Sequence, residues 1–120
     1  MNDNKKIKER AHEFAIDIIQ VAKKMPKDPA GFVLGRQLIK SGTSIGANVE
    51  EATGAFSKDD FIFKMNVALK EARETNYWLR LAGDSGLTKD MDVKDILSES
   101  ENIKNILSAI VKTSRERRLS

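Results

Sequence analysis

Apolar residues recur every three or four positions through most of this chain, and this spacing restricts what the chain can fold into. It lines the apolar residues along one side of an α-helix, whereas a half-buried strand needs strict alternation. No segment rich in Val, Ile and Thr alternates in that way. The 120 residues include two Pro and seven Gly, too few for a turn-dense β fold. The sequence therefore predicts an all-α protein.

Four stretches carry the helical spacing, and we expect helices at about residues 4–24, 30–55, 58–82 and 91–117. Pro26 and Pro29 separate the first two stretches, because proline does not continue a helix. The other connections are also short, which favours antiparallel neighbours. We therefore predict a single domain over residues 1–120, folded as an antiparallel up-down-up-down four-helix bundle.

The second stretch contains five glycines, and four of them, Gly31, Gly35, Gly42 and Gly46, each cost a helix up to about 1 kcal/mol relative to alanine. One interpretation is a bent helix, or two helices broken near residues 41–44. The other is that small residues let a neighbouring helix approach closely, at Gly42, Gly46 and Ala47. The spacing alone does not distinguish the two.

Composition excludes many kinds of active site. Cysteine is absent and His12 is the single histidine, so we expect no metal, no cofactor and no enzymatic activity. The 21 basic residues exceed the 18 acidic ones by a net charge of +3, which permits contact with nucleic acid without requiring it. No apolar run approaches the roughly 20 residues of a membrane helix, and the N-terminus is polar. We therefore expect a cytoplasmic protein with no membrane partner.

The third helix is apolar on two sides. One broad side is expected in the core, and nearly opposite it lie Phe63, Val67, Trp78 and Leu81, which we call the apolar strip of the third helix. A helix of this kind needs a second partner. One alternative is that loops or the second helix wrap over the strip. We favour self-association through it, because aromatic side chains suit such interfaces.

Two segments in the middle of the chain are more specific than the spacing. They are QLIKSGTSIGANVEEA at residues 37–52 and DFIFKMNVALKEARETNYWL at residues 60–79. Both resemble the signature blocks of the bacterial four helix bundle protein family, also called the 23S rRNA intervening-sequence proteins and often labelled ribosomal proteins. One departure is at residues 47–52, where the family often has Ala-Asn-Ile-Ala-Glu-Gly and this chain has ANVEEA.

The resemblance implies an antiparallel four-helix bundle that assembles as a homo-oligomeric ring, commonly a pentamer. It also implies similarity to the accessory variability protein of diversity-generating retroelements, which works with a reverse transcriptase and its RNA. It does not imply an enzyme. Members encoded within rRNA intervening sequences suggest a connection with RNA, although fold does not fix function.

Polar residues step along one edge of the second helix and one edge of the third. We call them the polar seam: Gln37, Ser41, Ser44, Asn48, Glu51, Lys64, Glu71 and Thr75. These edges are expected to pair by hydrogen bonds and a Lys–Glu contact, as an interhelical lock that fixes register. The alternative is a surface that binds a ligand or RNA. Ser and Glu without an activating base make a weak catalytic set.

The predicted topology brings charges together. In an antiparallel bundle the start of the first helix lies beside the end of the fourth, so we expect a basic pole there. This candidate RNA-binding set comprises Lys5, Lys6, Lys8, Arg10, Lys112, Arg115, Arg117 and Arg118. The alternative is solvated helix ends that complement the helix dipoles. A second, weaker set comprises Arg36, Lys40, Lys70, Arg73 and Arg80.

From these features we expect a non-enzymatic, homo-oligomeric scaffold protein that binds structured RNA through basic surfaces, by backbone charge rather than by base reading. No aromatic residue interleaves the basic pole, so stacking on single-stranded bases is not expected there. The alternative is an adaptor ring for a protein partner, such as a reverse-transcriptase accessory protein, as the resemblance implies.

Overall fold

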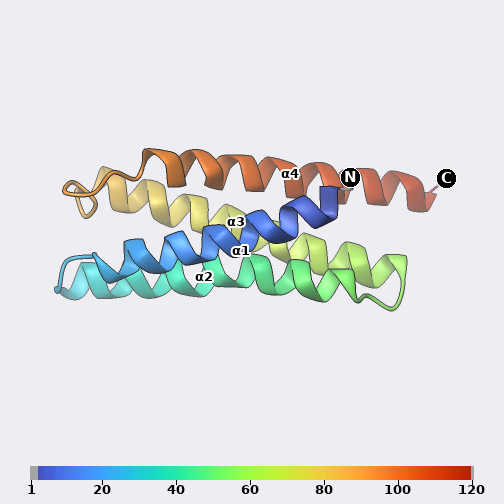
Figure 1. Cartoon of the computed structure of the whole chain (residues 1–120), viewed down its shortest axis with the longest axis horizontal. Coiled ribbons are helices and arrows are strands. Elements are labelled where there is room, and N and C mark those ends of the chain that lie inside the picture. The colour runs from blue at the N-terminus through green and yellow to red at the C-terminus, as the bar shows by residue number, and fades with distance from the viewer. Residues whose placement is uncertain (1–2, 120) are drawn as a thin grey trace.

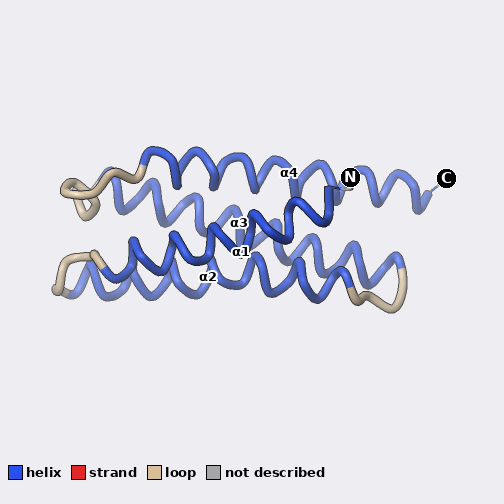
Figure 2. The backbone as a smooth tube through the Cα atoms, in the orientation of Figure 1, coloured by secondary structure: helices blue, strands red, loops and turns tan. Residues whose placement is uncertain are grey.

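Four long helices make up the chain in a computed structural model, which describes residues 3–119 and the side chains from residue 7 onward. The helices are α1 (Asp3–Lys23), α2 (Pro29–Thr53), α3 (Lys58–Asp84) and α4 (Lys94–Leu119). Residues 3–119 contain no strand (Figure 2). The prediction of an all-α four-helix bundle is confirmed.

The helices lie alongside one another in a rod of 50 × 21 × 21 Å (Figure 1). Each helix packs against its neighbours in the chain, and α4 returns to pack against α1. The α1–α4 contact is the least extensive of the four, and the pairs α1–α3 and α2–α4 lie diagonally across the core. In cross-section the four helices therefore occupy the corners of a square, and the α1–α4 side has the least packing.

The core contains the apolar stripe of each helix. Phe14 of α1, Leu38 of α2, Met65 of α3 and Leu107 of α4 are all buried within one continuous cluster. Burial of a large apolar side chain stabilises the fold by about 1.5–3 kcal/mol. The three-to-four spacing thus has the structural meaning that the sequence predicts.

The α2 helix is continuous from Pro29 to Thr53, so the alternative of two shorter helices is wrong. A Cβ atom built on Gly42 would lie 2.8 Å from Cγ2 of Ile18 in α1. A Cβ on Gly46 would lie 3.7 Å from Ala11, which is an ordinary contact. Close approach of α1 therefore explains the glycine at position 42.

Local hydrogen bonds end the helices. The α3 helix ends at Asp84, and Gly86 follows with φ = 82°, a conformation that favours glycine. The N–H of Leu87 donates to the carbonyl of Ala82 at 2.9 Å, and the N–H of Gly86 donates to the carbonyl of Gly83 at 3.1 Å. This pair of bonds is a Schellman motif. Its geometry turns the chain back toward α4.

The α4 helix begins at Lys94 rather than near residue 91 and continues to Leu119. The carboxylate of Asp92 accepts a hydrogen bond from the N–H of Lys94 at 3.2 Å, which satisfies a donor at the start of the helix. Figure 1 shows α4 extending well past the beginning of α1 at the C-terminal end. This offset decides which charges meet.

Candidate nucleic-acid interface

The predicted basic pole is divided by the register of α1 against α4. Arg10 donates two hydrogen bonds to the Glu99 carboxylate, from Nη2 at 2.6 Å and from Nε at 2.9 Å. Arg10 is therefore level with Glu99, and Lys112 lies 13 residues further along α4. At 1.5 Å per residue the separation is about 20 Å. The expectation that Arg10 neighbours the cations in the last turns of α4 is therefore wrong.

Acidic residues of other helices pair with several of these cations. Lys8 lies 3.2 Å from the Glu50 carboxylate of α2, and the Arg118 guanidinium contacts the Asp59 carboxylate of α3. The Arg10 guanidinium holds the pKa of Glu99 below its usual value, chiefly by hydrogen bonding. The side chains of Lys5 and Lys6 lie outside the described residues. Much of the positive charge expected at this pole is thus neutralised within the bundle.

The remaining members of the basic pole lie on the turns of α4 that extend past α1. These are Lys112, Arg115 and Arg117, with Arg118 at the end of the same segment. Among the described side chains, these cations form a basic end of the α4 helix. Such an end complements the negative pole of the α4 dipole.

The polar seam lies between α2 and α3. Its centre is a hydrogen bond between the Ser41 and Thr75 hydroxyls, whose oxygens are 2.9 Å apart and buried. Toward the far end of α2, the Lys64 ammonium lies 3.6 Å from the Glu51 carboxylate. The buried centre is not accessible to a ligand while the helices remain packed, which favours the interhelical lock.

Other members of the polar seam bond within their own helix. The Ser44 hydroxyl donates to the Lys40 carbonyl at 2.6 Å, and the Asn48 amide donates to the Ser44 carbonyl at 2.8 Å. Gln37 lies half-buried on the same edge. These bonds satisfy the side chains locally and do not join the two helices.

Glu71 is a member of the polar seam whose pKa departs from its ordinary value. Partial burial raises its pKa, and the nearby carboxylate of Glu74 raises it further. Lys70 and Lys40 act in the opposite direction. The Glu71 carboxyl beside the seam therefore holds its proton more readily than a free glutamate does.

A different basic surface lies between α3 and α4, and we call it the α3–α4 cleft. It is a polar cavity of about 330 Å³ whose lining includes Arg73, Arg80, Lys104, Asn105 and Ser108. A second cavity of about 690 Å³ continues it along the contact between α3 and α4 and adds Lys94 and Asn102. Arg73 and Arg80 belong to the second predicted basic set, whereas Lys94, Lys104 and Asn105 were not singled out from the sequence.

Buried Asn76 holds the cleft together. Its amide nitrogen donates to Ser100 Oγ at 3.2 Å and to the Glu101 carboxylate at 2.9 Å, while its carbonyl oxygen accepts from Arg80 Nε at 3.0 Å. Lys104 lies 2.7 Å from Glu101 and lowers the pKa of that carboxyl. Asn76 thus orients the Arg80 guanidinium at the rim. Glu101 is the single carboxylate among the residues that line the two cavities.

An exposed aromatic ring lies beside the cleft. The Arg80 guanidinium carbon is 5.7 Å from the centroid of the Tyr77 ring, which is 48% exposed. The Tyr77 and Trp78 rings meet edge to face with centroids 5.1 Å apart. The cleft therefore combines cations with an accessible aromatic surface, unlike the predicted basic pole.

The apolar strip of the third helix (the α3 apolar strip) is unevenly covered. Phe63 is 63% exposed and Leu81 is also exposed, whereas Val67 and Trp78 are half-buried. Trp78 packs against the core, and its Nε1 is the buried side-chain nitrogen without a hydrogen-bond partner among the described residues. Within the part of the chain described here, no other element covers Phe63. The strip thus has two exposed apolar residues near its two ends.

The described part of the chain, residues 3–119, offers neither a metal site nor a membrane-spanning segment. No group of three His, Cys, Asp or Glu side chains there could hold a metal ion, and His12 is exposed. No helix in that range combines the length and apolar character needed to cross a membrane. The α3–α4 cleft is a cationic candidate site that the fold assembles from two helices.

Comparisons with known proteins agree with this fold. Residues 3–109 match the family model described as 23S rRNA-intervening sequence protein. A crystal structure of a protein of unknown function, from the S23 ribosomal protein family of Bacteroides thetaiotaomicron VPI-5482, is similar with a TM-score of 0.84 and 39% identity. The alignment covers 92% of this chain and 99% of that chain. None of the curated proteins compared with the chain matches it. The family match contains the α3–α4 cleft and ends before Lys112.

Proposed function

Since the chain belongs to the 23S rRNA-intervening sequence protein family, we propose that it is a non-enzymatic, oligomeric scaffold that binds structured RNA. The family name connects its members with rRNA, and the similar solved structure is of unknown function. The proposed RNA surface is the α3–α4 cleft rather than the basic pole. The proposal includes self-association through the α3 apolar strip.

The observation that carries the proposal is the cation set of Arg73, Arg80 and Lys104 at a cavity of about 330 Å³. Arginine and lysine bind phosphate oxygens, and such contacts supply most of the affinity for a nucleic-acid backbone. Arginine forms bidentate bonds to phosphate, and Asn76 holds Arg80 in a fixed orientation. The single acidic residue nearby, Glu101, already pairs with Lys104.

Tyr77 adds a second kind of contact. Proteins that read RNA loops and bulges stack unpaired bases on exposed aromatic rings. Tyr77 is beside Arg80, so one base could stack while the adjacent phosphate meets the guanidinium. This arrangement favours structured RNA with unpaired bases over a continuous duplex.

Self-association would multiply this single cleft. Phe63 and Leu81 are separated by 18 residues of α3, or about 27 Å along the helix. An oligomer built on this strip repeats the cleft in every subunit, and linked weak sites bind a long RNA more tightly than one site does. The proposed assembly is a ring, with a pentamer as the expected size.

The direct test is RNA binding as a function of salt, with light scattering on the same samples to give the subunit number. We propose the double variant Arg73→Gln, Lys104→Gln, with Lys112→Gln, Arg115→Gln as the control of equal charge. The cleft variant should weaken binding and reduce the salt slope by roughly 0.7–0.9 for each phosphate contact removed. The control should keep both.

Two results would redirect the proposal. If the control variant loses RNA and the cleft variant does not, the basic end of α4 is the RNA surface. If the oligomer ignores RNA even at low salt, the protein is better described as an adaptor for a protein partner. A monomer in light scattering would contradict the ring.

A further inference from the structure

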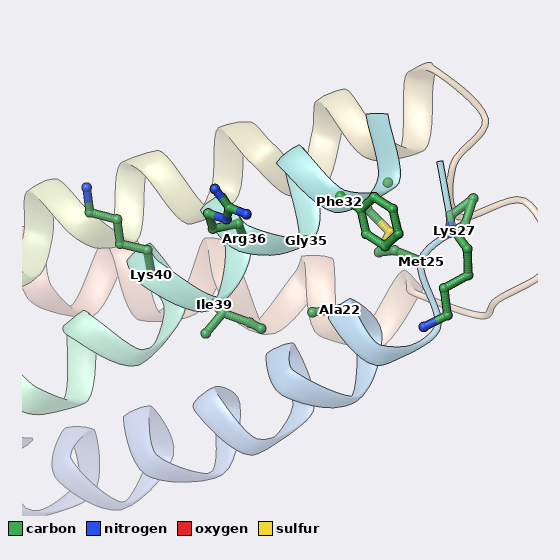
Figure 3. Close-up of a pocket in the computed structure, with 10 residues that line it drawn as sticks. Ala22, Met25, Lys27, Phe32, Gly35, Arg36, Ile39 and Lys40 are labelled. Carbon is green, nitrogen blue, oxygen red and sulfur yellow. The ribbon is translucent and has the colours of Figure 1, made fainter. Parts of the chain in front are cut away.

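The turn between α1 and α2 borders an open groove of about 570 Å³ that the RNA proposal does not use (Figure 3). It lies where the last turns of α1 meet the first turns of α2. Gly31 shapes one end of it, because a Cβ there would lie 1.9 Å from the Pro26 carbonyl oxygen, whereas a Cβ on Gly35 would lie 3.7 Å from the Ala22 carbonyl oxygen, an ordinary contact. Because Gly31 carries no side chain, the start of α2 comes close to Pro26, and Ala22 and Met25 of the preceding segment line the groove.

Exposed apolar side chains line this groove. Phe32 is 56% exposed and Ile39 is 41% exposed, although both are large and apolar. They are seven residues apart on α2, which puts them on the same side of the helix two turns apart. Figure 3 shows Ile39 and Ala22 between α2 and α1, with Phe32 over Met25 at the other end. Exposed apolar residues grouped in this way mark an interaction site.

The charged residues that line the groove are all basic. Its lining contains Lys27, Arg36 and Lys40 and no acidic residue. None of these three cations takes part in an ion pair of the described residues shorter than 4.0 Å. The nearby Asp28 carboxylate accepts the Gly31 N–H at 2.8 Å and caps α2. Lys40 also acts on Glu71 from a distance.

We propose that this groove docks a short, acidic amphipathic helix of a partner protein. A helix of this kind presents apolar residues at i, i+3 or i+4 and i+7, which match the spacing of Phe32 and Ile39. Phe32 and Lys40 are eight positions apart on α2, or about 12 Å, which corresponds to roughly two turns of a docked helix. Carboxylates beside its apolar stripe would meet Lys27, Arg36 and Lys40.

The apolar and the basic residues of the lining together indicate which kind of partner fits the groove. A nucleic acid would satisfy the cations and leave Phe32 and Ile39 exposed, and a neutral apolar helix would leave the cations without partners. An acidic amphipathic helix satisfies both. The groove lies on α1 and α2, so its occupation does not require the α3–α4 cleft or RNA binding.

The probe for the test is a labelled synthetic peptide of roughly three turns, with Leu at i, i+3 and i+7 and Glu between them. Fluorescence anisotropy measures its binding to the full-length protein. Two comparison peptides have the same Leu pattern with Lys for Glu, or the same composition with the Leu positions scrambled. We expect binding of the acidic amphipathic peptide alone.

Variants locate the site. Phe32→Ser and Arg36→Glu should each weaken peptide binding by about tenfold or more. The controls are Phe56→Ser, a fully exposed phenylalanine outside the groove, and Lys112→Glu, and both should bind as the wild type does. The cleft double variant Arg73→Gln, Lys104→Gln should also keep peptide binding. Circular dichroism verifies that Phe32→Ser remains folded, as an exposed position predicts.

Each other result would overturn the proposal. Equal binding of the three peptides, or equal loss in the Phe56→Ser control, would show contact without a specific groove. Binding of dodecanoate at the groove with no binding of the acidic peptide would identify a site for small anionic amphiphiles. A smaller oligomer for Phe32→Ser in light scattering, with no peptide binding, would show that a second copy of the chain covers the groove.

Discussion

Gly42 of α2 lies so close to Ile18 of α1 that a Cβ on the glycine would be 2.8 Å from Ile18 Cγ2. Ile18 is fully buried, and its β-branched side chain has little freedom to move aside. Four residues further along α2, a Cβ built on Gly46 would lie 3.7 Å from the nearest atoms of Ala11 in α1. Close packing against Ile18 therefore requires a glycine at position 42, whereas the packing at position 46 leaves room for a Cβ, although the two glycines look alike in the sequence.

Alanine substitutions at the two glycines should change the free energy of unfolding in opposite directions. Gly42→Ala should lower the free energy of unfolding by about 1–2 kcal/mol, because overpacking exceeds the gain in helix propensity. Gly46→Ala should raise it by about 0.5–1 kcal/mol, because only the propensity changes. Urea unfolding of both variants measures the difference. A stabilising Gly42→Ala would mean that α1 and α2 separate easily at this point.

The Ser41–Thr75 bond should be worth a measurable part of the α2–α3 contact. Thr75→Val keeps the shape of the side chain and should cost about 1 kcal/mol, since a buried hydroxyl of Ser41 loses a partner. The double variant Ser41→Ala, Thr75→Val should cost less than the sum of the single variants. Thr43→Val, on the outer side of α2, serves as the control. Additive costs would show that the two hydroxyls act independently.

Glu99 should make stability depend on pH. Its folded pKa lies below the usual value of 4.5, because Arg10 binds the ionised carboxylate. A lowered folded pKa contributes stability above the unfolded pKa, and the contribution disappears as the pH falls through the folded pKa. With both side chains about one-third exposed, Glu99→Gln should cost about 0.5–1 kcal/mol at neutral pH. The difference in the free energy of unfolding between the variant and the wild type should vanish at a pH below the folded pKa of Glu99. Urea denaturation at neutral pH and at acidic pH measures this difference.

Glu71 should behave in the opposite way. Burial and the Glu74 carboxylate raise its folded pKa above 4.5. A raised folded pKa contributes stability below the unfolded pKa, and this contribution is lost as the pH rises through the folded pKa. Glu71→Gln should therefore gain stability relative to the wild type as the pH rises from acid to neutral. If the variant instead loses stability at neutral pH, Lys40 and Lys70 outweigh the burial.

The α3 apolar strip should control the subunit number. Phe63→Glu with Leu81→Glu places charge at two exposed positions, so the isolated bundle should remain folded. If the strip joins subunits, buried unpaired charges should dissociate the oligomer, as light scattering detects. Trp78 is a poorer site for this test because it packs against the core. Ile16→Glu, another exposed apolar position, is the control.

The sequence predicted the elements that depend on local spacing. The apolar stripes, the two prolines and the short connections indicated four antiparallel helices, and the structure contains them. The two signature segments indicated the family, which the match over residues 3–109 confirms. These features repeat every turn or stand in consecutive positions, so they can be recognised without knowing which helices touch.

The meeting of distant side chains could not be predicted in this way. The basic pole depended on aligning the start of α1 with the end of α4, but Arg10 lies opposite Glu99 and α4 continues past α1. Lys104 reaches the cleft because α3 and α4 bring Asn76 beside Glu101. The sequence did single out Arg73 and Arg80 as a second basic set. It did not indicate that α4 would complete the cleft beside them.

The sequence by itself thus determined the helices, the core stripe of each and the family. The tertiary structure alone decided which cations pair with Glu50, Glu99 and Asp59, which cations border an open cavity, and why Gly42 must be small. The physical reason is that helix formation and amphipathicity are properties of neighbouring residues, read within a turn or two. The axial register between helices arises instead from packing of whole side-chain surfaces and from connection lengths, and a small change in register moves every charge to a new partner.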